Sequence, residues 1–164
     1  MSGKSKRLSH VDQAGKASMV DVSNKPDTQR TAHARGQIKM QAETVSAIEG
    51  NRLKKGDVLA TARIAGVMAA KRTHDLIPLC HPLALTDVQV DIIKTDQGFS
   101  VETSVRTTGK TGVEMEALSA CTVALLTLYD MAKAIDRRMV IDGVAVVEKS
   151  GGASGDWVAP VPTP

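Results

Sequence analysis

The sequence predicts an α+β fold in which helices pack on one face of an antiparallel sheet. Three features indicate this class. The triplet DQG at 96–98 separates two alternating runs and signals a hairpin. Two long helical patterns, at 57–75 and 112–136, lie on either side of that hairpin. Further alternating segments begin near Thr31 and follow the second helix, so strands and helices intersperse along the chain.

The 164 residues suit one domain with a hydrophobic core of its own. Residues 1–30 are polar around one short apolar island, and we expect an N-terminal arm that is free to move. Residues 31–150 should form the catalytic domain, and 151–164 a Gly/Pro-rich tail.

The first predicted elements are a strand from Thr31 to about 41 and a short helix over 42–50 that ends at Gly50. A turn over 51–56 follows. Asp57 is a suitable N-cap for the next helix, which should end before Pro78.

The hairpin should occupy 85–109, the long helix 112–136 and a last strand 137–150. The resulting order, β-α-α-β-β-α-β, is close to the ferredoxin-like plan. The long helix has little polar surface in its middle. We therefore expect it to bury part of itself against another copy of the chain, in a homo-oligomer.

Composition argues against several classes of protein. Twenty-one basic and 18 acidic residues leave a net charge of +3, and only Phe99, Tyr129 and Trp157 could stack on bases. Nucleic acid is thus not an expected partner. Cys80 and Cys121 lie in different sequence contexts, and we find neither an N-terminal apolar run for export nor a candidate membrane span in the sequence. We therefore expect a cytoplasmic protein with free thiols. Cys121, in the middle of a helix, should pack in the core.

The segment PLCHPL, 78–83, holds a cysteine and a histidine between two prolines that stiffen the loop. Such a loop could hold a metal, present a reactive thiol or form one wall of a pocket. A metal site would use Cys80 and His81 with a third ligand from His74, Glu114 or Glu116, but no recognised ligand spacing is present. We expect a pocket wall and no metal.

Asp130 and Lys133 are three residues apart on a helix and can interact. They could form a surface ion pair, or a proton-transfer pair in which the carboxylate positions the lysine or burial lowers the lysine's pKa. Glu116 falls on nearly the same face of the helix as Asp130, about 21 Å away along the axis. Glu114 and Glu116 also suit a helix start for electrostatic reasons alone.

Basic residues form three further groups. Lys54 and Lys55 occupy a turn, where lysines are usually solvated. Lys149 precedes two glycines that could let backbone N–H groups approach a phosphate, although the spacing is not that of a P-loop. From their charge and their place in the sequence, the residues that we expect to bind phosphates are Lys71, Arg72, Lys149 and Arg30.

Four long motifs together resemble the MoaC family of cyclic pyranopterin monophosphate synthases. They are KGDVLATARIAGVMAAKRTHDLIPLCHPL, GKTGVEMEALSA, LYDMAKAID and KSGGASGDW. They occur in the right order, and with HVDQAGKASMVDVS the resemblance covers nearly the whole chain. It implies a lyase that converts 3',8-cyclised dihydro-GTP into cyclic pyranopterin monophosphate, releasing pyrophosphate in molybdenum cofactor biosynthesis.

The same resemblance implies a ferredoxin-like hexamer, a trimer of dimers with sites between subunits. Asp130 matches the family's acidic catalytic residue, with Lys133 beside it and Lys55 as a further catalytic residue. The matched substrate contacts are Leu79, Cys80, His81, Met115 and Glu116, with Glu114 close by. We expect no resident cofactor; whether Mg²⁺ accompanies the triphosphate is left open.

A second reading is a non-catalytic oligomeric nucleotide-binding protein, in which the lysines hold phosphates and nothing turns over. Asp130 discriminates between the two, because a pure anion binder has no use for a carboxylate in its site. An RNA-binding module would instead lose affinity steeply with salt.

Overall fold

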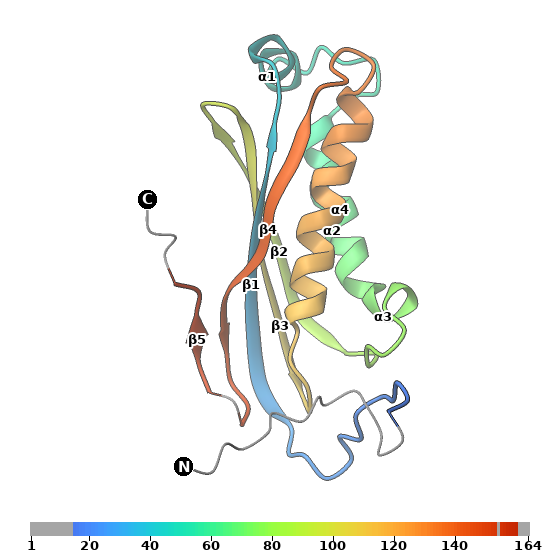
Figure 1. Cartoon of the computed structure of the whole chain (residues 1–164). Coiled ribbons are helices and arrows are strands. Elements are labelled where there is room, and N and C mark those ends of the chain that lie inside the picture. The colour runs from blue at the N-terminus through green and yellow to red at the C-terminus, as the bar shows by residue number, and fades with distance from the viewer. Residues whose placement is uncertain (1–14, 154, 161–164) are drawn as a thin grey trace.

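A computed structural model describes residues 15–153 and 155–160, drawn in colour in Figure 1. Residues 1–14 of the expected arm, and 154 and 161–164 of the expected tail, lie outside the described residues. The elements in chain order are β1 (Thr28–Lys39), α1 (Ala42–Glu49), α2 (Val58–Lys71), α3 (Thr73–Leu76), β2 (Leu85–Thr95), β3 (Gly98–Gly109), α4 (Glu114–Ala132), β4 (Val140–Ser150) and β5 (Trp157–Val158).

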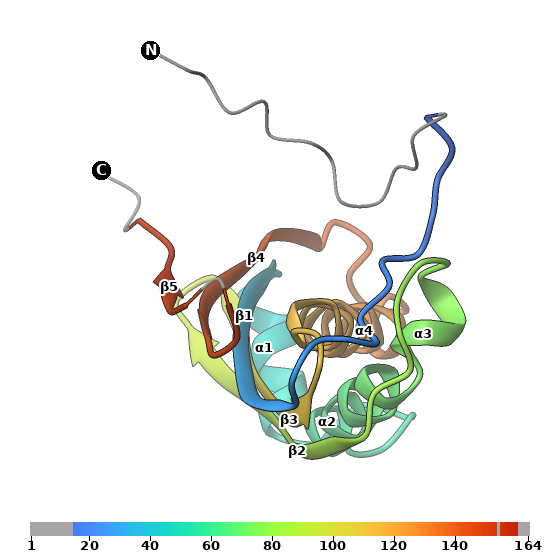
Figure 2. The same cartoon turned by 90° about the horizontal axis from the view of Figure 1, so that it is seen from below.

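One sheet with the strand order β2-β3-β1-β4-β5 carries the fold, and every pair of neighbours is antiparallel. The predicted α+β class with an antiparallel sheet is confirmed. The two long helices α2 and α4 lie on the same side of the sheet (Figures 1 and 2). The short strand β5, which the sequence did not predict, pairs through Trp157 with Lys149 at the free edge of β4.

The predicted hairpin is confirmed, with Thr95 paired to Gly98 across the turn. Gly98 has a φ of +149°, and a Cβ there would lie 2.0 Å from the carbonyl oxygen of Ile38. Only glycine allows this close approach, which brings β3 against the end of β1.

The predicted helix over 57–75 is divided in two. Its N-cap is confirmed, because the Asp57 side chain accepts from the Ala60 N–H at 2.9 Å. The helix stops at Lys71, however, and a separate turn, α3, begins at Thr73. The buried hydroxyl of Thr73 donates to the carbonyls of Ala69 and Ala70, each at 3.1 Å, and so satisfies acceptors at the end of α2.

The core lies between α4 and the sheet, and α2 packs on α4. Cys121 is fully buried in this core, as predicted. A Cβ at Gly66 of α2 would lie 2.9 Å from the Ala120 carbonyl, so glycine permits the close helix contact. By length and composition alone α4 could cross a membrane, contrary to expectation, but half of its apolar window is buried inside the fold. Packing on the sheet and on α2 accounts for the buried half of its apolar surface.

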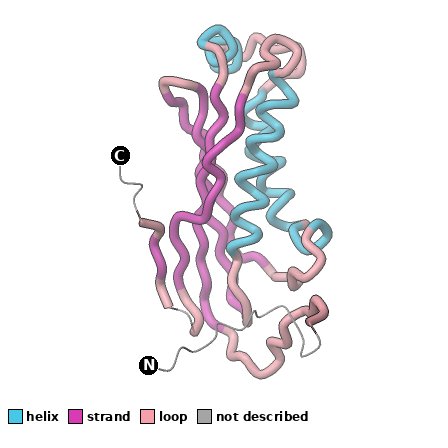
Figure 3. Tube along the Cα trace, in the orientation of Figure 1, coloured by secondary structure: helices cyan, strands magenta, loops and turns pink. Residues whose placement is uncertain are grey.

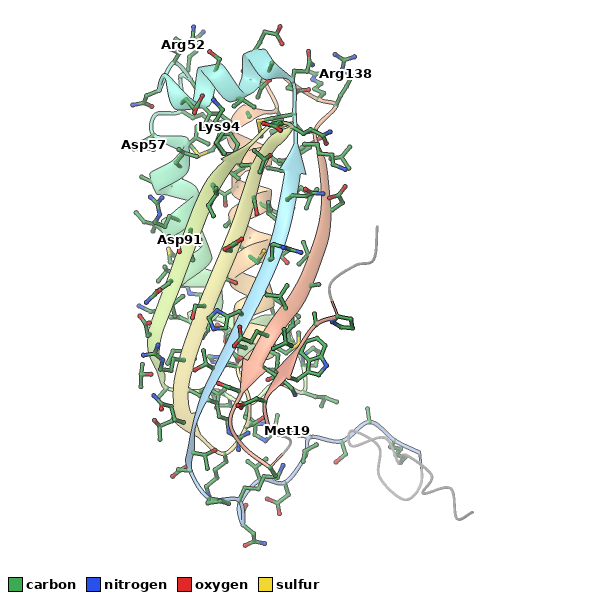
Figure 4. The ribbon with its side chains drawn as sticks, turned by 90° about the vertical axis from the view of Figure 1, so that its left-hand side faces the viewer. Met19, Arg52, Asp57, Asp91, Lys94 and Arg138 are labelled. Carbon is green, nitrogen blue, oxygen red and sulfur yellow. The ribbon has the colours of Figure 1, made fainter. Side chains whose placement is uncertain are left out.

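The other face of the sheet carries polar side chains, and no helix of the described residues covers it (Figure 4). Along β1, Ala32, Ala34 and Ile38 are buried toward the helices, whereas Arg35 on the opposite face is exposed. This alternation is typical of an antiparallel sheet with one covered face. In Figure 3 the helices accordingly form a single layer beside the strands.

A buried carboxylate, Asp136, joins the end of α4 to the start of α1. It is 1% exposed and accepts from the Gln41 N–H at 2.9 Å, the Thr44 hydroxyl at 3.2 Å and the Arg138 N–H at 3.0 Å. Burial alone would raise the pKa of Asp136, but these donors lower it overall. The turn that follows Lys133 is thereby fixed.

We expect Asp136→Ala to destabilise the protein by about 2 kcal/mol, because buried donors lose a charged acceptor. Because its folded pKa lies below the ordinary value of 3.8, Asp136 stabilises the fold above that pH, and the effect is lost as pH falls through the folded pKa. Thermal midpoints at pH 7 and pH 3 test this. The gap between wild type and Asp136→Ala should narrow in acid; a constant gap would contradict it.

Candidate active site

Three charged side chains meet where α4 ends and the turn before α2 begins. The Asp130 carboxylate accepts from Lys133 Nζ at 2.7 Å and from Lys55 Nζ at 2.8 Å. Lys55 also donates to the Asp130 carbonyl at 2.9 Å. The expected contact between Asp130 and Lys133 is confirmed. Lys55 is not a free turn lysine, because it bonds a residue 75 positions along the chain.

The charges of this cluster reinforce one another. The hydrogen bonds and charges of Lys133 and Lys55 lower the pKa of Asp130 to about 2. Asp130 in turn raises the pKa of Lys133, contrary to the idea that burial lowers it. The side chains of all three residues are about half exposed. At neutral pH the described chain therefore presents one carboxylate that holds two protonated amines in fixed positions.

A groove of about 730 Å³ lies at the opposite end of α4. The PLCHPL loop forms one wall, in which the Cys80 N–H bonds the Ile77 carbonyl at 3.0 Å around a turn with Pro78 in its first central position. The described residues that line the groove are Val20, Val22, Lys25, Ile77, Pro78, Leu79, Cys80, His81, Thr111, Gly112, Glu114, Met115 and Glu116. The expected pocket wall and the expected contacts on α4 thus share one cavity.

Within this groove Cys80 and Glu116 are paired. The Cys80 thiol lies 3.5 Å from Oε1 of Glu116, which is 3% exposed, and Oε2 of that carboxyl has no partner among the described residues. Burial, followed by the Glu116 charge and hydrogen bond, raises the pKa of Cys80 to about 11. Burial also raises the pKa of Glu116. A thiol that stays protonated is a hydrogen-bond donor and a poor nucleophile.

A cationic pocket of about 160 Å³ adjoins the groove and shares Lys25 and Glu114 with it. Its other charged residues are Arg30, Lys110 and Lys149. Lys149 bonds Glu114 at 2.8 Å. Burial raises and Lys149 lowers the pKa of Glu114, which is lowered overall. Four cations against one carboxylate make this pocket suitable for a polyanion.

Arg30 is held by backbone oxygens in this pocket. Its Nε donates to the Gly109 carbonyl at 3.0 Å and its Nη2 to that of Lys110 at 3.2 Å. A Cβ on Gly152 would collide with this guanidinium, so the glycine makes room for Arg30. The N–H of Gly151 donates to the Asp156 carboxylate instead of pointing to an open site. Gly152 therefore makes room for a cation, and the Gly151 N–H already has an acceptor within the protein.

The structure does not bring two predicted residues to these sites. Lys71 and Arg72 are exposed at the end of α2 and line none of the described pockets. Conversely, Lys25 and Lys110 were missed in the cationic pocket. Pairing of Thr28 with Gly109 places Lys110 beside the start of β1, a register that sequence alone does not fix. Arg137 was also missed; it lines a surface pocket with the Asp130 cluster.

The two sets of residues do not converge within one chain. Glu116 lies in the first turn of α4 and Asp130 in its last turn, so about 21 Å of helix separates them. Across residues 15–153 and 155–160, no three His, Cys, Asp or Glu side chains are grouped so as to hold a metal ion.

The chain is similar to known proteins over nearly its whole length. A model of the MoaC family matches residues 19–152. A cyclic pyranopterin monophosphate synthase from Roseiflexus sp. (strain RS-1) is 59% identical over 154 residues, 92% of this chain and 97% of the relative. One of the same name from Brucella ovis (strain ATCC 25840 / 63/290 / NCTC 10512) is 55% identical over 164 residues, 99% of this chain and 98% of the relative.

Proposed function

Because the chain belongs to the MoaC family, we propose that it is a cyclic pyranopterin monophosphate synthase of molybdenum cofactor biosynthesis. It would act as a lyase on 3',8-cyclised dihydro-GTP and release pyrophosphate. The observation that carries this function is the Lys55–Asp130–Lys133 cluster, because its carboxylate holds two amines that can transfer protons.

The reaction needs several proton transfers, because the purine-derived ring opens by hydrolysis and closes again. Protonated Lys55 and Lys133 can each donate a proton and take one back, and Asp130 fixes both amines. To form the cyclic phosphate, a ribose-derived hydroxyl attacks the α-phosphorus. The bond to the β-phosphate oxygen breaks, the hydroxyl proton passes to a base, and pyrophosphate leaves.

The groove and the cationic pocket suit opposite ends of this substrate. The rings fit against the PLCHPL loop, and the triphosphate fits the adjoining Arg30, Lys110 and Lys149. Those cations would stabilise the charge on the departing pyrophosphate. We assign Lys71 and Arg72 no contact within one chain. Mg²⁺ bound to the triphosphate would add its positive charge to that of these cations. We propose no resident cofactor.

A site between subunits would bring one end of α4 in one chain close to the opposite end of α4 in a second chain. We propose a ferredoxin-like fold, which the strand order β4-β1-β3-β2 supports. We also propose that six chains assemble into a hexamer in the cytoplasm. Exposed apolar side chains on the outer surface of the helices, Ile64, Met68 and Leu126, provide area for such contacts.

Light scattering should therefore show a particle of six chains at micromolar concentration, because apolar helix surface favours association. A monomer under these conditions would contradict both the hexamer and the shared site.

Pyrophosphate release tests the function directly. The purified protein is incubated with 3',8-cyclised dihydro-GTP, and pyrophosphate and the cyclic phosphate product are measured. Binding without release would favour the non-catalytic nucleotide-binding protein, for which the four cations of the pocket also provide a site.

The His81 ring has no hydrogen-bond partner among the described residues and lines the groove. We expect His81→Ala to lose most activity, because the ligand loses a polar contact. His33, on the face of β1 that turns away from the helices and outside the groove lining, supplies the matched control, and His33→Ala should stay close to wild type. Equal rates for the two variants would remove His81 from the site.

A further inference from the structure

The Cys80 thiol occupies an unusual position for a residue in a ligand groove. It lies 3.5 Å from Oε1 of Glu116 and 3.8 Å from the His81 carbonyl oxygen, so both of its contacts are acceptors within the protein. A protonated thiol has one hydrogen to donate, and the carboxyl is the nearer and more strongly charged acceptor. The thiol is thus directed at Glu116.

Glu116 needs such a contact because the fold leaves its carboxyl poorly satisfied. The side chain is 3% exposed, it lines the groove, and its Oε2 has no hydrogen-bond partner among the described residues. The last torsion of a glutamate is soft and nearly two-fold, so a carboxyl without partners can rotate. A buried carboxyl oxygen without a donor destabilises the fold. A ligand N–H or O–H at this wall would remove that destabilisation.

We propose that Cys80 is a positioning residue for Glu116: its thiol holds Oε1, fixes the rotation of the carboxyl and keeps Oε2 as the acceptor for an N–H or O–H of the ring in the groove. This inference rests on the proposed function, because that function supplies a ring with such donors. Cys80 then contributes to binding through Glu116.

The surroundings of Glu116 define how this contact depends on pH. Burial raises the pKa of Glu116, and the backbone N–H of Glu116 and then the Cys80 hydrogen bond oppose that. Glu114 on the same helix raises it further, and His74 of α3 lowers it. His81 and Lys25 line the same groove. Loss of the thiol donor therefore raises the pH below which Glu116 is protonated, and a protonated carboxyl is a poorer acceptor.

Thiol reactivity tests the pairing without any turnover. Cys80 is modified with iodoacetamide over a range of pH, with Cys80→Ser as the blank that reports any reaction of buried Cys121. Glu116→Gln removes a charge that raises the pKa of Cys80 and should speed modification severalfold at pH 8. Glu114→Gln, a neighbouring carboxylate not bonded to the thiol, is the matched control and should change the rate less. Equal rates in wild type and Glu116→Gln would overturn the pairing.

Turnover tests the consequence. Cys80→Ala should raise KM for the cyclised dihydro-GTP by roughly tenfold with a smaller change in kcat, since a hydrogen bond to a charged group is lost. The acidic limb of kcat/KM should move to higher pH. Cys80→Ser, whose hydroxyl also donates, should restore both toward wild type. Equal effects of Ala and Ser, or an unmoved acidic limb, would overturn the positioning role. If wild type releases no pyrophosphate, the proposed function fails, and thiol reactivity still decides the pairing.

Discussion

Asp130→Asn should fold and assemble, and bind the cyclised substrate, yet release pyrophosphate on the order of 100-fold more slowly or worse. Asparagine is nearly isosteric with aspartate, but it cannot hold two ammonium groups by charge. Lys133 and Lys55 both bond this carboxylate, at 2.7 and 2.8 Å. The substitution therefore disturbs the placement of both proton donors at once. Single-turnover rates measure the loss separately from binding.

Lys133→Ala should give a comparable loss, because it removes one of the donors that Asp130 positions. The two groups act as a unit, so the double variant should be little slower than either single variant. Nearly additive losses would mean that the residues act independently.

The competing interpretation is an exposed ion pair, and it has structural support in the half-exposed side chains of the cluster. Exposed pairs contribute about 1 kcal/mol or less to stability. That interpretation predicts small changes in thermal midpoint and nearly normal turnover for all three variants. Wild-type rates in Asp130→Asn would remove Asp130 from the catalytic residues.

Contacts between near neighbours in sequence were the ones that could be predicted. The Asp57 cap, the hairpin turn at Gly98 and the pairing of Asp130 with Lys133 each follow from spacings of a few residues, and the structure contains all three. Their geometry is set by helix and turn periodicity, which a sequence displays directly.

Contacts that depend on strand register or on side-chain competition could not be predicted. Lys55 reaches Asp130 across 75 residues, and Lys110 reaches the cationic pocket only because Thr28 pairs with Gly109. The division of the helix at Arg72 is marked by no glycine or proline in the sequence. The resemblance placed Cys80 and Glu116 in one site, but the hydrogen bond between them is seen only in the folded chain.

The separation of the two half-sites leads to the last prediction, which concerns mixed oligomers. One half-site is the Asp130 cluster and the other is the groove with its cationic pocket, and about 21 Å of α4 separates them in one chain. Asp130→Asn leaves the groove intact, and His81→Ala leaves the cluster intact. If each site takes one half from each of two subunits, equal mixing makes about a quarter of the sites fully wild type.

We therefore expect co-expressed Asp130→Asn and His81→Ala chains, isolated as mixed oligomers through two different affinity tags, to recover roughly a quarter of wild-type pyrophosphate release although each variant alone is nearly inactive. The matched control mixes Asp130→Asn with Lys133→Ala. Both lesions lie in the same half-site, so no combination of subunits restores it and activity should stay low. If the first mixture is no more active than this control, the shared site is contradicted. A site contained within one chain would carry one of the two lesions in every subunit, so mixing could not restore it. Each site would have to be completed within one chain, which the length of α4 opposes.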